Sequence, residues 1–209
     1  MIRLALPKGR SLEVARAALA RAGYDLGRLD LDGRSLRHRL PEAGLELLLL
    51  KDRDLPLYVE RGIADCGVVG RDVLDEMDGD LLVPLELAGG RCRLSLIGPA
   101  GTALPRPGAQ VRLATKYPRT AERFLAGEPW SAEVLELSGS IELAPLLGLS
   151  DVILDIVQSG ATLAAHGLAE LRTVREIAPC LVVHRAAWQT LRVELGELMA
   201  RLERAGAAA

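Results

Sequence analysis

The segment Asp151–Thr162 has the residue types and order expected of a sugar-phosphate site. It reads DVILDIVQSGAT, so an apolar strand carries Asp155 to a small polar turn that opens a helix. The turn consists of Ser159, Gly160, Ala161 and Thr162. Backbone N–H groups at a helix N-terminus attract phosphate, and a glycine there allows close approach. A carboxylate such as Asp155 can bind ribose hydroxyls, although a capped helix without a ligand fits the tetrapeptide as well.

Positive charge follows two other apolar runs. Lys8 and Arg10 lie between a first predicted strand and a first predicted helix, and Lys51 follows the run Leu45–Leu50. Open α/β sheets bind ligands at the carboxyl ends of their strands, and cations at a helix N-terminus favour anions. A solvated basic turn explains Lys8 and Arg10 equally well, and capping of a helix by Asp54 explains part of the second segment.

Alternating strands and helices must position these residues. Apolar runs predict strands at residues 2–6, 45–50, 65–69, 93–97, 111–114, 134–137, 152–157 and 181–183. Helical spacing and capping signals predict helices at residues 12–22, 56–61, 71–77, 118–125, 141–147, 161–166 and 185–204. This alternation indicates an α/β protein with mostly parallel sheets. The leucines of the last helix are expected to pack on the body of the protein; they are Leu191, Leu195, Leu198 and Leu202.

Turn-rich segments near residues 84–90 and 98–108 indicate a boundary between two lobes. We expect lobe I to contain residues 1–87 completed by residues 181–209. Lobe II would contain residues 88–180 and carry the phosphate-binding turn. A cleft between two such lobes is the default ligand site. No internal repeat is visible in the sequence.

Bulk properties exclude several classes of protein. The 209 residues carry a formal charge of −2, whereas nucleic-acid binders normally have a basic excess. No stretch has the roughly 18 uncharged apolar residues of a membrane span, and no signal peptide is visible, so a cytoplasmic protein is expected. The cysteines have no zinc or disulfide spacing and the histidines no metal or triad spacing; these are Cys66, Cys92, Cys180, His38, His166 and His184.

Together, these segments resemble the ATP phosphoribosyltransferases, the family that begins histidine biosynthesis. The matching blocks are LPKGR at residues 6–10, DLPLYVERG at 54–62, DCGVVGRD at 65–72 and ATKYP at 114–118. The family signature is also in register, at Glu142, Gly148, Ser150, Ile153, Asp155, Ser159, Gly160, Thr162 and Leu163. One departure is Lys51-Asp52, where the family often has a basic residue followed by proline.

The resemblance implies a fold like that of type II periplasmic binding proteins, with two α/β lobes, mostly parallel sheets and a central cleft. It also implies the reaction of ATP with phosphoribosyl pyrophosphate to give phosphoribosyl-ATP and pyrophosphate. Magnesium would be bound mainly through the substrate phosphates, with no protein side chain assigned as a ligand. Such a reaction requires orientation of two substrates and positive charge around the departing pyrophosphate.

Residue roles follow from the matching positions. Ser159, Gly160, Ala161 and Thr162 would hold the 5′-phosphate, and Asp155 the ribose hydroxyls. Lys8, Arg10 and Lys51 would face pyrophosphate or the phosphates of ATP. Arg34 matches a family arginine, and Glu142 and Asp72 would line the cleft.

The chain ends at Ala209, without the additional regulatory domain of long family members, and so resembles the short form. Short forms work with a regulatory subunit that resembles a histidyl-tRNA synthetase. The resemblance therefore implies a hetero-oligomer with that partner and a homodimer without it.

Two other functions are compatible with parts of the sequence. Enzymes of the other phosphoribosyltransferase fold usually have two adjacent acids before the phosphate turn, whereas Ile156 follows Asp155 here. A non-enzymatic solute-binding protein of the same fold is the second alternative, although such proteins are normally exported. Release of pyrophosphate from ATP plus phosphoribosyl pyrophosphate would separate the three.

Overall fold

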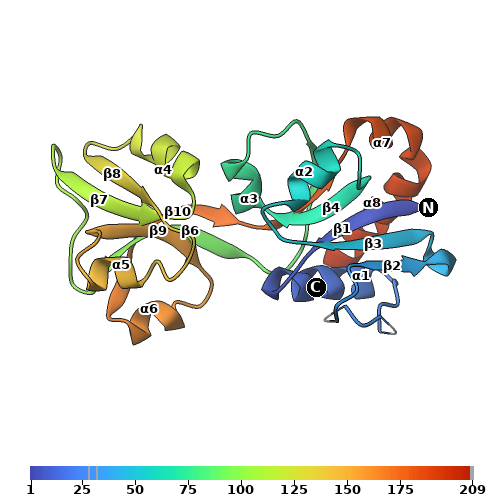
Figure 1. Ribbon diagram of the computed structural model, residues 1–209, viewed down its shortest axis with the longest axis horizontal. Coiled ribbons are helices and arrows are strands. Elements are labelled where there is room, and N and C mark those ends of the chain that lie inside the picture. The colour runs from blue at the N-terminus through green and yellow to red at the C-terminus, as the bar shows by residue number, and fades with distance from the viewer. Residues whose placement is uncertain (28, 32, 208–209) are drawn as a thin grey trace. The chain divides into compact units, whose positions relative to one another are not determined.

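The computed structural model describes residues 1–27, 29–31 and 33–207, except for the side chain of Arg10. The chain forms two compact units. Unit 1 contains Met1–Gly90 and Ala178–Ala209, and unit 2 contains Arg91–Ile177. Each unit has its own β-sheet with helices packed on both faces (Figure 1).

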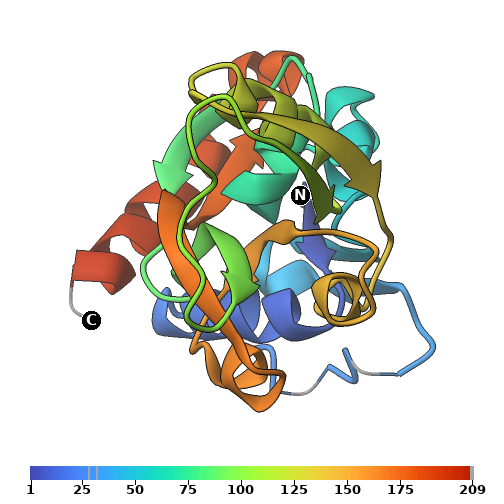
Figure 2. The ribbon, with the colours of Figure 1, turned by 90° about the vertical axis from the view of Figure 1, so that its left-hand side faces the viewer.

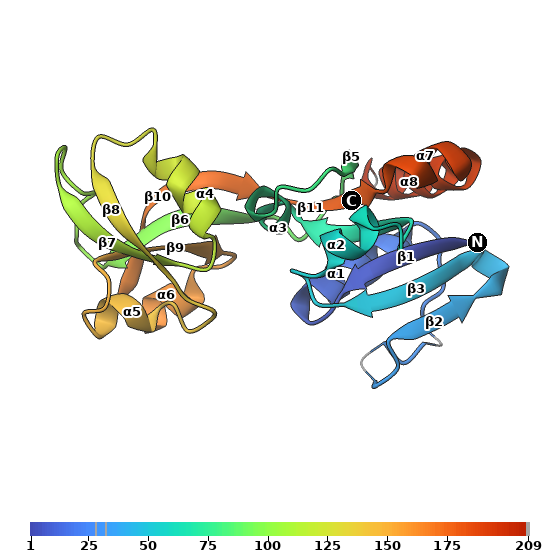
Figure 3. The ribbon, with the colours of Figure 1, turned by 45° about the horizontal axis from the view of Figure 1, so that its top comes forward.

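Unit 1 contains a six-stranded sheet in the order β2-β3-β1-β4-β11-β5. Its strands are β1 (Ile2–Pro7), β2 (Arg37–Leu40), β3 (Leu45–Leu50), β4 (Cys66–Gly70), β5 (Leu82–Glu86) and β11 (Pro179–Val183). Strands β3, β1 and β4 pair in parallel, while β2 and β11 run the opposite way. Strand β2 lies at the free edge beside β3 (Figure 3).

The helices of unit 1 bury apolar residues against both faces of this sheet. They are α1 (Arg10–Arg21), η1 (Pro41–Ala43), α2 (Leu55–Glu60), α3 (Arg71–Glu76), α7 (Arg185–Thr190) and α8 (Arg192–Ala207). Helices α1 and α8 share one core with Leu4 and Leu6, and α2 and α3 share another with Ala5. Opposite faces of β1 thus carry alternate residues into the two cores.

Unit 2 contains a five-stranded sheet in the order β10-β6-β9-β7-β8. Its elements are β6 (Cys92–Pro99), β7 (Gln110–Thr115), α4 (Pro118–Leu125), β8 (Ser131–Glu136), α5 (Leu143–Leu146), β9 (Val152–Val157), α6 (Ala161–Ala165) and β10 (Leu168–Ile177). Strands β8, β7 and β9 pair in parallel, and β6 pairs antiparallel with β9 and β10. Figure 2 shows α4 and α6 on opposite sides of this sheet, each over its own apolar core.

The two units use the same hydrogen-bonded clamp where their parallel strands begin. In unit 1, Asp65 accepts from the backbone N–H and guanidinium of Arg3, and Arg3 also donates to the carbonyl of Gly62. In unit 2, Asp151 accepts in the same way from Arg112, and Arg112 also donates to the carbonyl of Gly148. Both aspartates stand three residues after the glycine. This repeated arrangement of arginine, aspartate and glycine was not predicted from the sequence.

Several predicted elements need correction. Strands β2, β5 and β10 were not expected, and the final helix is divided at Leu191 into α7 and α8. Asp54 is the N-cap residue of α2, but its side chain makes no capping hydrogen bond, since its φ and ψ are already helical. The prediction that the last helix packs on the body is confirmed, because Leu195, Leu198 and Leu202 are buried. In the described part of the chain, no helix is long and apolar enough to cross a bilayer.

Candidate functional site

The lysines of unit 1 lie side by side at the carboxyl edge of its parallel strands. Strands β1 and β3 are in register with Pro7 opposite Leu50, so Lys8 and Lys51 follow paired positions. The N–H of Lys8 donates to the carbonyl of Leu50 at 2.8 Å, which extends the ladder one step further. Both lysine side chains are exposed. Two adjacent cations at this edge form a site suited to phosphate groups.

Arg34 and Asp72 belong to the same edge of unit 1. The N–H of Leu49 donates to the carbonyl of Leu36 at 2.8 Å, so the chain just before β2 runs beside the end of β3. Arg34 is in this exposed segment, two residues before Leu36. Asp72 stands in the first turn of α3, directly after β4. Four of the predicted site residues of this unit are therefore gathered at one edge by strand pairing.

A second acidic group at this edge was not predicted. Asp52 accepts a hydrogen bond from the hydroxyl of Ser11 at 3.0 Å, which ties the end of β3 to the first turn of α1. Partial burial raises the pKa of Asp52, the Ser11 hydroxyl opposes that shift, and the charge of Asp72 adds to it. The lysines thus share their edge with two carboxylates that repel each other.

The turn that follows β1 has a backbone that favours glycine. Gly9 has φ 74° and precedes α1, whose first residue is Arg10. An added Cβ at Gly9 would meet open space, so its requirement for glycine is conformational and not steric. The prediction for Arg10 concerns a side chain that lies outside the described atoms.

The phosphate-binding turn predicted in unit 2 follows β9 at the equivalent edge. Gly160 adopts φ 78°, and the first intrahelical bond runs from the N–H of Ala164 to its carbonyl. The preceding N–H groups of α6 therefore point out of the helix end. The N–H of Ala161 contacts the hydroxyl of Ser159 at 3.3 Å, and Ser159 and Thr162 are exposed. The turn presents small polar groups without any charge of its own.

Asp155 lies beside this turn and is held by a hydrogen bond and an ion pair. Its Oδ1 accepts a hydrogen bond from the N–H of Ile156 at 2.8 Å and forms an ion pair with Nζ of Lys116 at 3.1 Å. The carboxylate is largely covered, with 19% of the side chain exposed. Lys116 was not among the predicted site residues. The signal that could have identified it is its position within two residues of the end of a predicted strand, as for Lys8 and Lys51.

Glu142 also follows a parallel strand of unit 2. It is the N-cap residue of α5, in the segment that leaves the end of β8. Ser140, two residues earlier, has φ 49°, a positive value that is unusual for a residue other than glycine. Such strain is found preferentially at functional turns. The predicted site residues of unit 2 are therefore all at the carboxyl edge of β7, β8 and β9.

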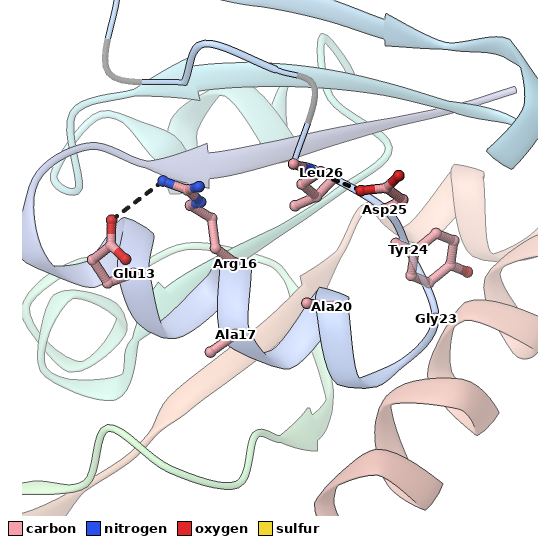
Figure 4. A pocket seen from close by; sticks show the side chains of 9 residues that line it. Glu13, Arg16, Ala17, Ala20, Gly23, Tyr24, Asp25 and Leu26 are labelled. Atoms are coloured by element: carbon pink, nitrogen blue, oxygen red, sulfur yellow. Dashed lines mark hydrogen bonds and ion pairs between the residues drawn. The ribbon is translucent and has the colours of Figure 1, made fainter.

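A separate cavity of about 640 Å³ lies on unit 1, between α1 and the segment after it (Figure 4). It is lined by Glu13, Arg16, Ala17, Ala20, Gly23, Tyr24, Asp25, Leu26 and Gly27. None of the predicted site residues is among these. The cavity is therefore distinct from the edge that carries the lysines.

The chemistry available at the two edges is binding and charge stabilisation. Unit 1 offers lysines for phosphate oxygens. Unit 2 offers backbone N–H groups and hydroxyls, together with the carboxylates of Asp155 and Glu142 and the ammonium of Lys116. Among the described residues, no group of three or more histidine, cysteine or acidic side chains is placed to hold a metal ion. An enzyme built from these groups would orient charged substrates and stabilise a departing anion.

Comparisons with known proteins agree with this chemistry. The sequence model of the family HisG: ATP phosphoribosyltransferase matches residues 51–204. The ATP phosphoribosyltransferase of Thermus thermophilus is 46% identical over 95% of this chain and 94% of its own length. ATP phosphoribosyltransferase 2 of Geobacter sulfurreducens is 40% identical over 97% of both chains.

Solved structures show the same relationship. A chain of the ATP phosphoribosyl transferase (HisG:HisZ) complex from Thermotoga maritima superposes with a TM-score of 0.82 at 32% identity, over 98% of this chain and 97% of that one. The periplasmic aliphatic sulphonate binding protein SsuA from Escherichia coli, at 13% identity and a TM-score of 0.65 over 99% of this chain and 72% of that one, shares the fold. This confirms the predicted likeness to periplasmic binding proteins. Since the relatives match over nearly their whole length, the chain belongs to the ATP phosphoribosyltransferase family, in its short form, and carries out the first step of histidine biosynthesis.

Proposed function

We propose that the two edges divide the substrates of the ATP phosphoribosyltransferase reaction between them. The turn Ser159–Thr162 binds the 5′-phosphate of phosphoribosyl pyrophosphate, and Asp155 binds the ribose hydroxyls. Lys8, Arg10, Lys51 and Arg34 contact the pyrophosphate group or the phosphates of ATP. Glu142 and Asp72 complete the polar lining of their respective edges.

The observation that carries this proposal is the placement of Asp155 next to an uncharged turn with a positive-φ glycine. Oδ1 of Asp155 is the atom held by the N–H of Ile156 and by Lys116, and we assign Oδ2 to the ligand. A sugar phosphate needs a hydrogen-bond acceptor for its diol and several N–H donors for its phosphate. The end of β9 supplies both, because the Asp155 carboxylate lies a few residues before the turn.

The chemistry requires little acid–base help from the protein. N1 of adenine already has a lone pair, which attacks C1 of the ribose as the bond to pyrophosphate breaks. The developing negative charge is on the leaving pyrophosphate. Lys8 and Lys51 are suited to stabilise it, because a preformed cationic site lowers the energy of a charge that grows in the transition state.

Magnesium fits this arrangement as an ion carried by substrate phosphates. Mg²⁺ usually keeps several waters and binds through one or two carboxylates together with phosphate oxygens. Asp52 and Asp72 are the carboxylates near the lysines, and their charges already interact. When bound, the ion would neutralise phosphate charge, while the lysines orient the same group.

The proposed function implies a partner and a compartment for this chain. The Thermotoga maritima structure is a HisG:HisZ complex, and we propose that this chain assembles with a HisZ-type subunit, which resembles a histidyl-tRNA synthetase. We further propose that the chain is a homodimer without that subunit. Because its substrates are ATP and a phosphorylated sugar, we place the reaction in the cytoplasm.

Pyrophosphate release tests the proposal. The purified chain, with and without a HisZ-type subunit, is mixed with ATP, phosphoribosyl pyrophosphate and Mg²⁺, and pyrophosphate is measured together with phosphoribosyl-ATP. We expect product only when both substrates and Mg²⁺ are present, and a large loss in the Asp155→Asn variant. Full activity of Asp155→Asn would contradict the assignment of the ribose site.

A further inference from the structure

Lysine is rare in this chain, and its positions are not random. The sequence has 26 lysines and arginines, of which lysines are only Lys8, Lys51 and Lys116. Each of the three directly follows a strand of a parallel group: β1 ends at Pro7, β3 at Leu50 and β7 at Thr115. Lysine is a compact point charge and arginine a planar fork. The chain therefore places its few compact cations only at carboxyl edges.

Lys116 in unit 2 is the topological equivalent of Lys8 in unit 1. Strands β1 and β7 are each the middle strand of three parallel strands. Each contains the sequence Arg-Leu-Ala, and its arginine is the one that forms the hydrogen-bonded clamp. The lysine follows that arginine by five residues in unit 1 and by four in unit 2. The carboxyl edge of unit 2 thus carries a cation, Lys116, at the position that corresponds to Lys8 in unit 1.

The backbone around Lys116 is fixed by a buried hydroxyl. Thr115 has no exposed surface, and its Oγ1 donates to the carbonyl of Leu154 at 2.7 Å and accepts from the N–H of Tyr117 at 3.0 Å. These bonds join the end of β7 to β9 and shape the turn that carries Lys116. Nζ of Lys116 lies 3.1 Å from Oδ1 of Asp155 and 5.7 Å from the centre of the Tyr117 ring.

We propose that Lys116 is a positioning residue that holds Asp155 ready for the ribose diol of phosphoribosyl pyrophosphate. The proposal rests on the function proposed above for Asp155. Lys116 and the N–H of Ile156 both engage Oδ1, which fixes the plane of the carboxylate and directs Oδ2 to the ligand. A carboxylate held in this way makes a charge-assisted hydrogen bond to a hydroxyl, which is stronger than a bond between neutral groups.

The test measures discrimination between two sugars that differ by one hydroxyl. Ribose 5-phosphate and 2-deoxyribose 5-phosphate are compared as competitive inhibitors against phosphoribosyl pyrophosphate. The full chain is used as wild type and as the variants Lys116→Met, Lys116→Arg and Asp155→Asn. Loss of a hydrogen bond to a charged group typically costs a factor of about ten or more. We expect Lys116→Met to reduce the preference for ribose about tenfold, Asp155→Asn at least as much, and Lys116→Arg less than either.

A purely structural role for Lys116 would weaken both inhibitors equally and leave their ratio unchanged. If Asp155→Asn loses the preference for ribose while Lys116→Met keeps it, the proposal for Lys116 is wrong and the ribose site stands. If Asp155→Asn also keeps the preference, the ribose site itself is wrong, and the proposal fails with it. Circular dichroism on each variant identifies any that fail to fold, and Lys116→Arg then decides the matter through its own ratio.

Discussion

The two units have the same amino edge and different carboxyl edges. Both tie an arginine to an aspartate that precedes the neighbouring strand, with nearly the same hydrogen bonds. At the opposite edge, unit 1 presents Lys8 and Lys51 as exposed cations, whereas unit 2 presents an uncharged turn beside Asp155, whose carboxylate is paired with Lys116. The amino edge of each sheet therefore stabilises its unit, while the carboxyl edge can carry different binding groups in the two units.

The largest effect is expected from a substitution at Gly160, in the turn of unit 2. Its φ of 78° is unfavourable for a β-branched residue, so Gly160→Val should move the turn and remove N–H groups from the phosphate. Each lost hydrogen bond to a charged group costs about 1.5–3 kcal/mol, so affinity for phosphoribosyl pyrophosphate should fall by about 100-fold, measured by calorimetry.

Gly108→Val is the matched control. Gly108 has the same φ of 78°, also faces open space for an added Cβ, and lies in the same unit just before β7. It should lose similar stability and keep its affinity for the substrate. Equal affinities for the two variants would show that the turn at Gly160 does not bind the phosphate.

The lysine edge of unit 1 should affect turnover more than binding of phosphoribosyl pyrophosphate. Lys8→Ala, Arg10→Ala and Lys51→Ala each remove a charge proposed to stabilise the leaving group. Losses in kcat on the order of 10²-fold are typical for such a contact. Arg185→Ala, which removes an exposed ion pair with Asp80, is the control and should retain the wild-type rate. Wild-type kcat in all three edge variants would refute the cationic site.

The shared clamps should differ in energy because they differ in exposure. The Asp65 side chain is 8% exposed and the Asp151 side chain 47%. Asp65→Ala removes a buried acceptor from the partly buried donors of Arg3 and should cost about 2 kcal/mol of unfolding free energy. Asp151→Ala breaks a solvated pair and should cost below about 1 kcal/mol. Denaturant titration measures both, and equal losses would mean that burial does not set the strength of the clamp.

The smallest effect is expected from removing the ion pairs of Glu46, and it should depend on pH. Arg37 and Arg39 hold the pKa of Glu46 at about 2, against an ordinary value of 4.5. A lowered folded-state pKa stabilises the protein above about pH 4.5, and the contribution disappears as the pH falls towards 2. Glu46→Gln should therefore lower the melting temperature at pH 7 and have little effect near pH 2. A difference that persists unchanged at both pH values would contradict the role of the ion pairs.

The sequence predicted the interior of both sheets better than their margins. The runs that became β1, β3 and β9 are apolar because both faces of these strands are covered. The missed strands β2, β5 and β10 all lie at sheet edges. Strand β2 is largely charged and β5 contains Pro84, as edge strands tolerate. Strand β10 has two register shifts, which disrupt the alternation by which a strand is recognised.

The site was predictable where a single segment carried it. The turn Ser159–Thr162 and the lysines after β1 and β3 can be identified from neighbouring residues alone. The contact between Lys116 and Asp155 cannot, because they are 39 positions apart in the sequence and strand register brings them together. The pair of Ser11 with Asp52 likewise depends on which strands are neighbours.

The position of β11 has a consequence for how the protein is made. This strand inserts between β4 and β5, yet it is synthesised after the whole of unit 2. Unit 2 is one continuous stretch, so on the ribosome it is the first unit whose sheet can close. The edges of β4 and β5 that β11 will pair with stay unpaired until residues 179–183 have left the ribosome. Domains usually fold in the order of translation; here the chain topology reverses that order, and a nascent chain stalled before β11 should be prone to aggregate through those edges.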